Sequence, residues 1–142
     1  MEGMTVRRLG PGDEREVERF AAAFDDPIRP GAVAAFLRDD RHHLLVASLN
    51  GRPAGFVSAV EILHPDKPVE LFLNELGVDE PYRRRGVATA LLEELCRVGR
   101  ELDCVTIWVL TDEDNDAAMA TYRRAGGVWD GEHQVMFEID LA

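Results

Sequence analysis

Cysteines and basic residues are scarce in this chain of 142 residues, and each shortage excludes a class of protein. Cys96 and Cys104 are its two cysteines, and their spacing matches no zinc motif. A domain of this length buries enough surface to fold without a disulfide, so we expect reduced, structural thiols. Lys and Arg number 16 against 27 Asp and Glu, a net charge of −11. This balance argues against a nucleic acid or an anionic membrane as partner and is compatible with a cationic one.

Long apolar runs, repeats and linkers are also lacking. Charged side chains interrupt the first twenty residues, so we expect no signal peptide, no membrane span and a cytoplasmic protein. One domain over residues 1–142 is expected. The four histidines are scattered, and the acidic run at 112–116 lacks the Gly and Glu that an EF-hand requires, so we expect no metal site.

Strand-like and helix-like segments alternate, which predicts an α/β (α+β) domain. We expect strands at residues 5–9, 44–49, 53–62, 69–78, 105–110 and 135–139. We expect helices at residues 13–24, 30–40, 87–102 and 116–125. Asn50-Gly51 is the sequence of a two-residue hairpin, and an apolar stripe marks residues 87–102 as an amphipathic helix. Asp13 and Glu16 resemble a capping box at the start of the first helix.

The most informative segment is the turn before the helix at 87–102, which reads Arg-Arg-Arg-Gly-Val-Ala over residues 83–88. A pyrophosphate needs several unpaired backbone N–H groups, which the first turn of a helix supplies. Gly86 and Ala88 let phosphate oxygens approach the backbone, and the arginines add positive charge. A short charge run is often only a solvated loop. Here the strand before it and the amphipathic helix after it favour a phosphate site, although the spacing fits neither nucleoside triphosphates nor NAD.

Arg83, Gly86 and Ala88 resemble the [Q/R]-x-x-G-x-[G/A] signature of the GCN5-related N-acetyltransferases (GNAT). Asn115, Ala118 and Tyr122 resemble the family's N-x-x-A-x-x-x-Y segment. The resemblance covers residues 5–140. It implies the GNAT fold, with a mixed, mostly antiparallel sheet of six to seven strands, about four helices, and strands that splay at the acetyl-coenzyme A site. It also implies an enzyme that takes acetyl-coenzyme A as co-substrate and acetylates a primary amine of a small molecule.

Two segments, 75–91 and 136–140, are similar to a narrower branch, aminoglycoside 3-N-acetyltransferase type I (gentamicin acetyltransferase). That similarity implies acetylation of an aminoglycoside, at the 3-amino group, and antibiotic resistance. Glu75 stands where this branch has Asp. Dimers are common in the family, so the resemblance allows a homodimer.

The resemblance also implies a set of residues that hold the cofactor. The backbone of residues 76–78 would bond the pantetheine arm, the turn and the first helical residues would hold the pyrophosphate, and Asn115 would meet the cofactor arm. Asn115 could equally be a helix N-cap. The expected cofactor set is Leu76, Gly77, Val78, Arg83, Arg84, Arg85, Gly86, Val87, Ala88, Thr89, Asn115, Ala118 and Tyr122.

Two side chains are candidates for proton transfer. Glu75 lies in an otherwise apolar strand, where it either faces a cleft or is paired in the core. Desolvation would raise its pKa toward the range of a useful base, and anchoring of a substrate ammonium is the alternative role. Tyr122 alone would be assigned to core packing. The resemblance implies instead that its phenol protonates the departing thiolate.

The sequence indicates least about the site that would bind the acceptor amine. A polycation would need several carboxylates, and Asp25, Asp26, Glu75, Glu138 and Asp140 are the candidates. Neither cysteine lies in the turn, so we expect direct transfer without an acyl-enzyme. The alternatives are acetylation of a polyamine, an amino acid or a protein N-terminus, or a non-catalytic module that binds coenzyme A.

Overall fold

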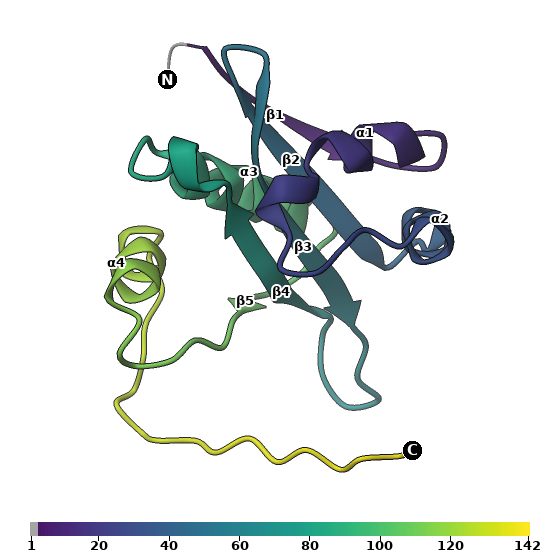
Figure 1. Cartoon of the computed structure of the whole chain (residues 1–142). Helices are drawn as coiled ribbons and strands as arrows, with labels where there is room; N and C mark the ends of the chain where they lie inside the picture. The colour runs from purple at the N-terminus through teal and green to yellow at the C-terminus, as the bar shows by residue number, and fades with distance from the viewer. Residues whose placement is uncertain (1–2) are drawn as a thin grey trace.

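The computed structural model describes residues 3–142 and forms one five-stranded sheet with helices on both faces (Figure 1). The strands lie in the order β1 (Met4–Leu9), β2 (His42–Leu49), β3 (Arg52–Ile62), β4 (Glu70–Val78) and β5 (Ile107–Trp108). The first four are antiparallel neighbours, and β5 is parallel to β4. The helices are α1 (Glu14–Arg19), α2 (Pro30–Arg38), α3 (Val87–Glu101) and α4 (Asp116–Arg124). Two short 3₁₀ helices are η1 (Ala21–Ala23) and η2 (Glu80–Tyr82).

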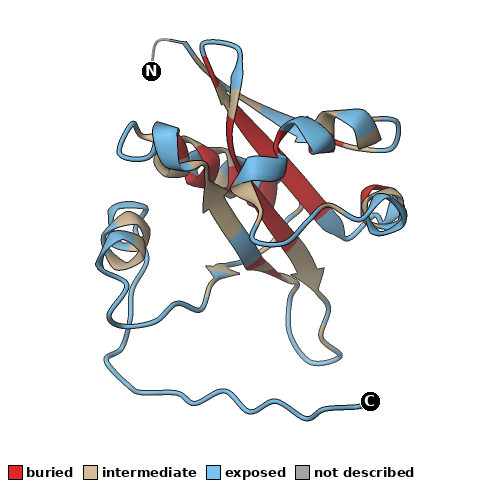
Figure 2. Ribbon diagram, in the orientation of Figure 1, coloured by how far each residue is buried: buried red, intermediate tan, exposed pale blue. Residues whose placement is uncertain are grey.

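Each face of the sheet has its own hydrophobic core (Figure 2). On one face α3 buries Leu91, Leu95 and Val98, which recur every three or four residues and pack against the central strands. On the other face α1 and α2 pack against β2 and β3, with Phe56 of β3 buried there. Side chains of β4 alternate between the two faces of the sheet, so each of them points toward one face or the other.

The strongest local predictions are confirmed. Asn50 and Gly51 both have positive φ, 52° and 79°, as a type I′ hairpin requires, and they join β2 to β3. Helix α3 is found within one residue of its predicted end. The sheet is mixed and mostly antiparallel with four α-helices, as expected.

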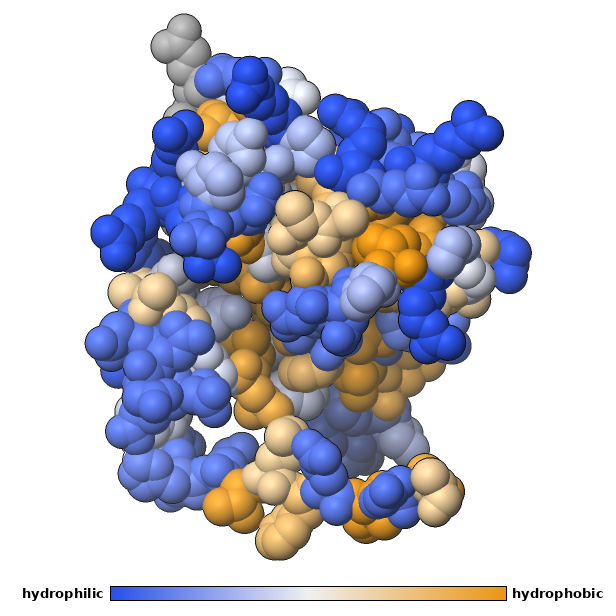
Figure 3. Space-filling view, viewed as in Figure 1, coloured by the Kyte–Doolittle hydropathy of each residue, from blue (hydrophilic) through white to orange (hydrophobic). Residues whose placement is uncertain are grey.

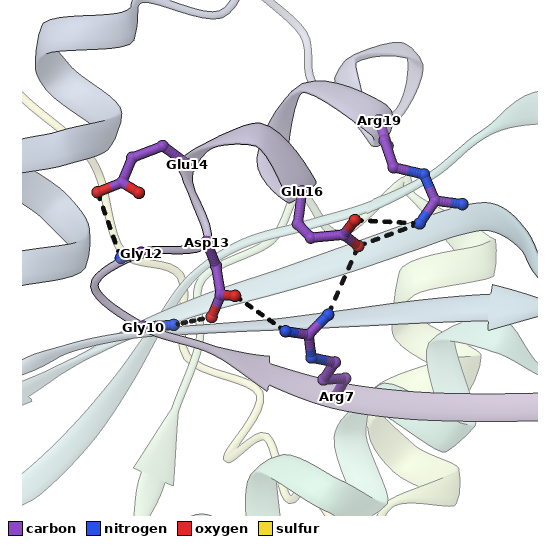
Figure 4. Close-up of polar contacts among 7 residues, drawn as sticks. All are labelled: Arg7, Gly10, Gly12, Asp13, Glu14, Glu16 and Arg19. Carbon is purple, nitrogen blue, oxygen red and sulfur yellow. Dashed lines mark hydrogen bonds and ion pairs between the residues drawn. The ribbon is translucent and has the colours of Figure 1, made fainter.

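The predicted capping box is wrong. The Asp13 carboxylate accepts hydrogen bonds from the Gly10 backbone N–H and from Arg7, each at 2.9 Å, and caps no N–H of α1 (Figure 4). Glu16 pairs instead with Arg7 and Arg19. These contacts close the turn between β1 and α1, and the first helix is shorter than predicted because it ends at Arg19 before η1.

The predicted strand at 135–139 is also wrong, and the described residues form five strands rather than six or seven. The chain after α4 is extended but has no strand partner, and Figure 1 shows it running away from the sheet. Strand β5 is correspondingly short, with two residues in place of the six predicted. Within residues 3–142, every helix is too short or too polar to cross a membrane.

Candidate active site

A cleft of about 1070 Å³ opens where β4 and β5 separate. Their parallel pairing is confined to Leu71 with Ile107 and Phe72 with Trp108, whereas β4 continues to Val78. The cleft is lined by the second half of β4, the turn before α3, one face of α4 and the segment around η1. Its volume is slightly above the range typical of small-molecule sites. The divergence of the strands is the splay that the family resemblance implies.

A β-bulge at Asn74 decides which side chains face this cleft. Ser58 of β3 pairs with Glu75 and the next residue, Ala59, pairs with Leu73, so Asn74 has no partner across the ladder. Before the bulge, Leu73 points into the core under α3. After the bulge the alternation is shifted by one residue, and Glu75 points to the opposite face. If residues 71–78 alternated regularly, with Asn74 paired like its neighbours, Glu75 would lie on the same face as Leu71 and Leu73.

Glu75 faces two further carboxylates across this face of the sheet. It is exposed at the cleft wall, yet loss of solvent around the carboxyl group raises its pKa, and the negative charges of Asp25 and Asp26 raise it further. A raised pKa makes a carboxylate a stronger proton acceptor. It also marks a place where a cationic group would relieve charge repulsion.

The segment that carries the acidic pair, Asp25 and Asp26, is held against the sheet by close packing. The rings of Phe24 and Phe56 stack with their centroids 3.7 Å apart. A Cβ on Gly77 would lie 2.2 Å from the carbonyl oxygen of Ala23, so only glycine allows this approach. The backbone that directly precedes Asp25 and Asp26 is therefore fixed against the sheet.

Ser58 lies beside the site without lining the cleft, and no sequence motif pointed to it. It is buried, it lies opposite Glu75 in the antiparallel ladder and so on the same face of the sheet, and its hydroxyl has no partner among the described residues. An unpaired buried hydroxyl beside a carboxylate can hold a water or a polar group of a substrate. The signal in the sequence is a small polar residue within an apolar strand, which is too common to be specific.

The turn before α3 presents free backbone donors to the cleft. Gly86 is the N-cap residue of α3 and has φ of 82°, a conformation that favours glycine. The first bond that enters the helix joins the Ala90 N–H to the Gly86 carbonyl, and no side chain caps the N–H groups of Val87, Ala88 and Thr89. Arg83 and Arg84 line the cleft beside them. This donor set fits a pyrophosphate.

Helix α4 supplies the opposite wall. Asn115 is its N-cap, and its side-chain oxygen accepts a hydrogen bond from the Ala118 N–H at 3.1 Å, so the capping role is confirmed. Tyr122 is half-buried, and burial raises the pKa of its phenol, which keeps it protonated at neutral pH. The phenol can therefore donate a proton in the cleft.

The structure brings most of the predicted site residues to this cleft. Lining it are Asp25, Glu75, Leu76, Gly77, Val78, Arg83, Arg84, Gly86, Val87, Ala88, Thr89, Asn115, Ala118 and Tyr122. Asp26 is outside the lining but close enough to act on the pKa of Glu75. Arg85 is exposed outside the cleft, and Glu138 and Asp140 lie on the extended C-terminal segment, away from it. Among residues 3–142, no three His, Cys, Asp or Glu side chains are grouped as metal ligands.

Comparison with known proteins gives a consistent result. Residues 11–127 match the model of the acetyltransferase (GNAT) family. The N-alpha-acetyltransferase RimI of Mycobacterium tuberculosis is 30% identical over 128 residues, which cover 88% of this chain and 78% of that protein.

Among solved structures, two aminoglycoside acetyltransferases from uncultured soil metagenomic samples are similar to this chain. One, meta-AAC0020 in complex with sisomicin, has a TM-score of 0.88 at 17% identity and covers 99% of this chain and 97% of that one. The other, HMB0005, has a TM-score of 0.82 at 27% identity and covers 98% of this chain and 99% of that one.

Proposed function

The chain belongs to the acetyltransferase (GNAT) family and is an N-acetyltransferase that uses acetyl-coenzyme A, and from this premise we propose that its acceptor is an aminoglycoside antibiotic. The reaction would be direct acetylation of a primary amine, at the 3-amino position, and would confer resistance to the antibiotic. The position rests on the resemblance of residues 75–91 and 136–140 to the 3-N-acetylating branch.

The observation that carries the proposal is the division of charge within the cleft. One end holds Arg83, Arg84 and the uncapped start of α3, which suit the anionic end of the cofactor. The other end holds Glu75 and Asp25, with Asp26 outside the lining but close enough to act on the pKa of Glu75. A carboxylate whose pKa is raised by burial and by neighbouring negative charges is stabilised by a ligand with several ammonium groups, and aminoglycosides are such ligands.

The chemistry assigned to the protein follows from this arrangement. Acetyl-coenzyme A supplies the acetyl group as a thioester. Glu75 accepts a proton from the acceptor's ammonium, directly or through a water, so that the free amine can form the new C–N bond. Tyr122 donates its phenolic proton to the sulfur as the C–S bond breaks, and the second proton that the nitrogen loses on becoming an amide restores the phenol, directly or through a water. Both pKa shifts favour these roles, because burial makes Glu75 a stronger base and keeps Tyr122 protonated.

The cofactor would be held by the backbone and the turn. The N–H groups of Val87, Ala88 and Thr89 would bind the pyrophosphate, with Arg83 and Arg84 adding positive charge. The Arg83 guanidinium already donates to the Val78 carbonyl at 3.1 Å, which ties the turn to the end of β4.

The test is thiol release from acetyl-coenzyme A with gentamicin, other aminoglycosides, spermidine, diamino acids and peptides as acceptors, with the product located by NMR. We expect the highest kcat/KM with an aminoglycoside and acetyl on the 3-amino group. Replacing both Asp25 and Asp26 by Asn should raise the KM for the aminoglycoside, and the matched Asp66→Asn change in an exposed loop should not. Equal turnover of all amines would contradict the proposal.

A second acceptor class is favoured by the sequence comparison. The relative from M. tuberculosis is an N-alpha-acetyltransferase, so the amine could be the N-terminus of a protein. An extended peptide would bind mainly through backbone hydrogen bonds and need no acidic pair. Turnover of peptides that survives the Asp25 and Asp26 changes would favour this second function.

A further inference from the structure

A second cavity, the apolar hollow, lies beside the cleft between α3, β5 and the end of α4. Its volume is about 270 Å³, and aliphatic side chains, glycines and two thiols make up most of its lining. Leu73 and Leu92 in this lining are buried, and Ile107 is half-buried. Walls of this kind favour an apolar group of a ligand. The proposed function leaves the hollow without a role.

The apolar hollow adjoins the catalytic cleft. Leu73, Val109 and Tyr122 line both of them. The last pair in the β4–β5 ladder joins Phe72 to Trp108, so Leu73 and Val109 are the next residues along the two strands. The boundary is therefore made of side chains and not of a backbone ladder, because the strands have parted there. In the space-filling view the side chains of α4, at the left, stand apart from the sheet, with hydrophobic residues in the space between them (Figure 3).

The sulfur of the acyl donor would lie at this boundary. Under the proposed function Tyr122 protonates the thiolate, so the sulfur comes within hydrogen-bond reach of its phenol. The acyl carbon is directly bonded to that sulfur, and an acyl chain therefore starts beside Leu73 and Val109. The amine approaches from the face of the sheet that carries Glu75, which is opposite the face of Leu73. A chain that extends into the hollow thus leaves the path of the amine open.

The apolar hollow has room for a short acyl chain. An apolar cavity of about 150 Å³ holds one molecule of benzene, which has six carbon atoms. At about 270 Å³ the hollow is larger than such a cavity. A straight chain of about four to six carbons would therefore fit in it. The acetyl group has one methyl group and would leave most of the hollow unfilled, so a longer chain would bury more apolar surface there.

We propose that the apolar hollow is an acyl-chain site, and that the enzyme also takes coenzyme A thioesters with straight acyl groups of about four to six carbons as donors. This rests on the proposed function for the place of the sulfur beside Tyr122, and it is independent of which amine is the acceptor. The transfer balances in the same way for every donor, because one C–N bond forms and one C–S bond breaks. Of the two protons that an ammonium loses, one ends on the coenzyme A thiol and one passes to water.

Two native thiols report on the hollow without any turnover. Cys96 and Cys104 both line it, and they are the two cysteines of the chain. Their alkylation by N-ethylmaleimide is followed by mass spectrometry of the full chain without acceptor. The buffer is alkaline, because loss of solvent raises the pKa of the Cys104 thiol. Saturating butyryl- or hexanoyl-coenzyme A should slow the alkylation at least about tenfold relative to saturating acetyl-coenzyme A.

Calorimetric titration without acceptor measures the same contact as a ratio of affinities. The dissociation constant of butyryl-coenzyme A should be roughly 15-fold lower than that of acetyl-coenzyme A, because each buried methylene contributes about fourfold. Ala125→Leu, at an exposed position of the hollow's lining, should remove most of this difference by filling the space. Arg123→Leu is the matched control, because it puts the same side chain on α4 at a position that lines neither cavity. It should leave the ratio unchanged.

Several results would overturn the proposal. Thiols that resist alkylation in the free protein would mean that another segment fills the hollow. Equal protection by acetyl- and butyryl-coenzyme A, or weaker binding of the longer thioester, would mean that the chain does not enter it. A ratio that Ala125→Leu leaves unchanged would place the chain elsewhere. If no thioester binds, the cofactor site of the proposed function fails as well, whereas thiol protection without turnover of any aminoglycoside would support the acyl-chain site and reject only that acceptor.

Discussion

Replacing Gly77 by Ala tests how tightly the segment before the acidic pair is held against β4. The new Cβ would lie 2.2 Å from the carbonyl oxygen of Ala23 and 2.7 Å from a ring carbon of Phe56. The Ala23 oxygen must retreat by roughly 1 Å to reach van der Waals contact. Overpacking of this kind costs about 1–3 kcal/mol of the free energy of unfolding.

For a domain of this length the cost corresponds to a melting temperature lower by roughly 3–10 °C, measured by calorimetry at neutral pH. Gly31→Ala is the matched control, because Gly31 lies in α2 with no atom within 4 Å of its added Cβ. That change should stabilise the protein by about 0.4–1 kcal/mol. A melting temperature of Gly77→Ala equal to that of the wild type, with Gly31→Ala stabilised, would refute this reasoning. In that case the segment is not packed on β4, and the acidic pair is not fixed beside Glu75.

The remaining predictions concern the cleft. Glu75→Gln should lower kcat/KM by about 10²–10⁴-fold and remove the acidic limb of its pH profile, because the base form exists only above the raised pKa of Glu75. Asp25→Asn should move that limb to lower pH in the enzyme that retains Glu75, since one of the charges that raise the pKa is removed. Tyr122→Phe should lower kcat by about 10²-fold or more at unchanged KM for acetyl-coenzyme A, because it removes the proton donor and keeps the ring. Asn115→Ala should destabilise the protein by about 1 kcal/mol in urea unfolding, through loss of the cap on α4.

Each of these has a result that contradicts it. A pH profile of Glu75→Gln that keeps the wild-type limb would assign the limb to another group. A limb that moves upward in Asp25→Asn would contradict the electrostatic account. A kcat of Tyr122→Phe equal to that of the wild type would mean that Tyr122 only packs in the core. Unchanged urea unfolding of Asn115→Ala would mean that its cap does not stabilise α4.

Features with short-range causes could be predicted from the sequence. The Asn50-Gly51 hairpin and the stripe of α3 depend on residues close together in the chain, and both were found where expected. The glycine at the start of α3 is of the same kind, since its role requires only a strand before it and a helix after it.

Features that depend on pairing between distant segments could not be predicted from the sequence. The bulge at Asn74 is visible only in the register of β4 against β3, and it is the reason that Glu75 faces the cleft and not the core. The position of Asp25 depends on the stack of Phe24 on Phe56, which joins separate parts of the chain. The alternation at 135–139 predicts a strand that the structure does not contain, because a strand forms only against a neighbour and alternation alone does not supply one.

The unpaired residue in β4 makes the location of the site a question of reading frame. Side chains of a regular strand alternate between its two faces, so one bulged residue moves every later residue to the face opposite the one that regular alternation would give it. If Asn74 were instead an ordinary paired residue, the same sequence would place Leu76 and Val78 in the cleft, with Glu75 and Gly77 under α3. One register of pairing therefore gives a catalytic wall and the other a hydrophobic core, and insertions or deletions at the paired positions of β4 should be tolerated far less than substitutions.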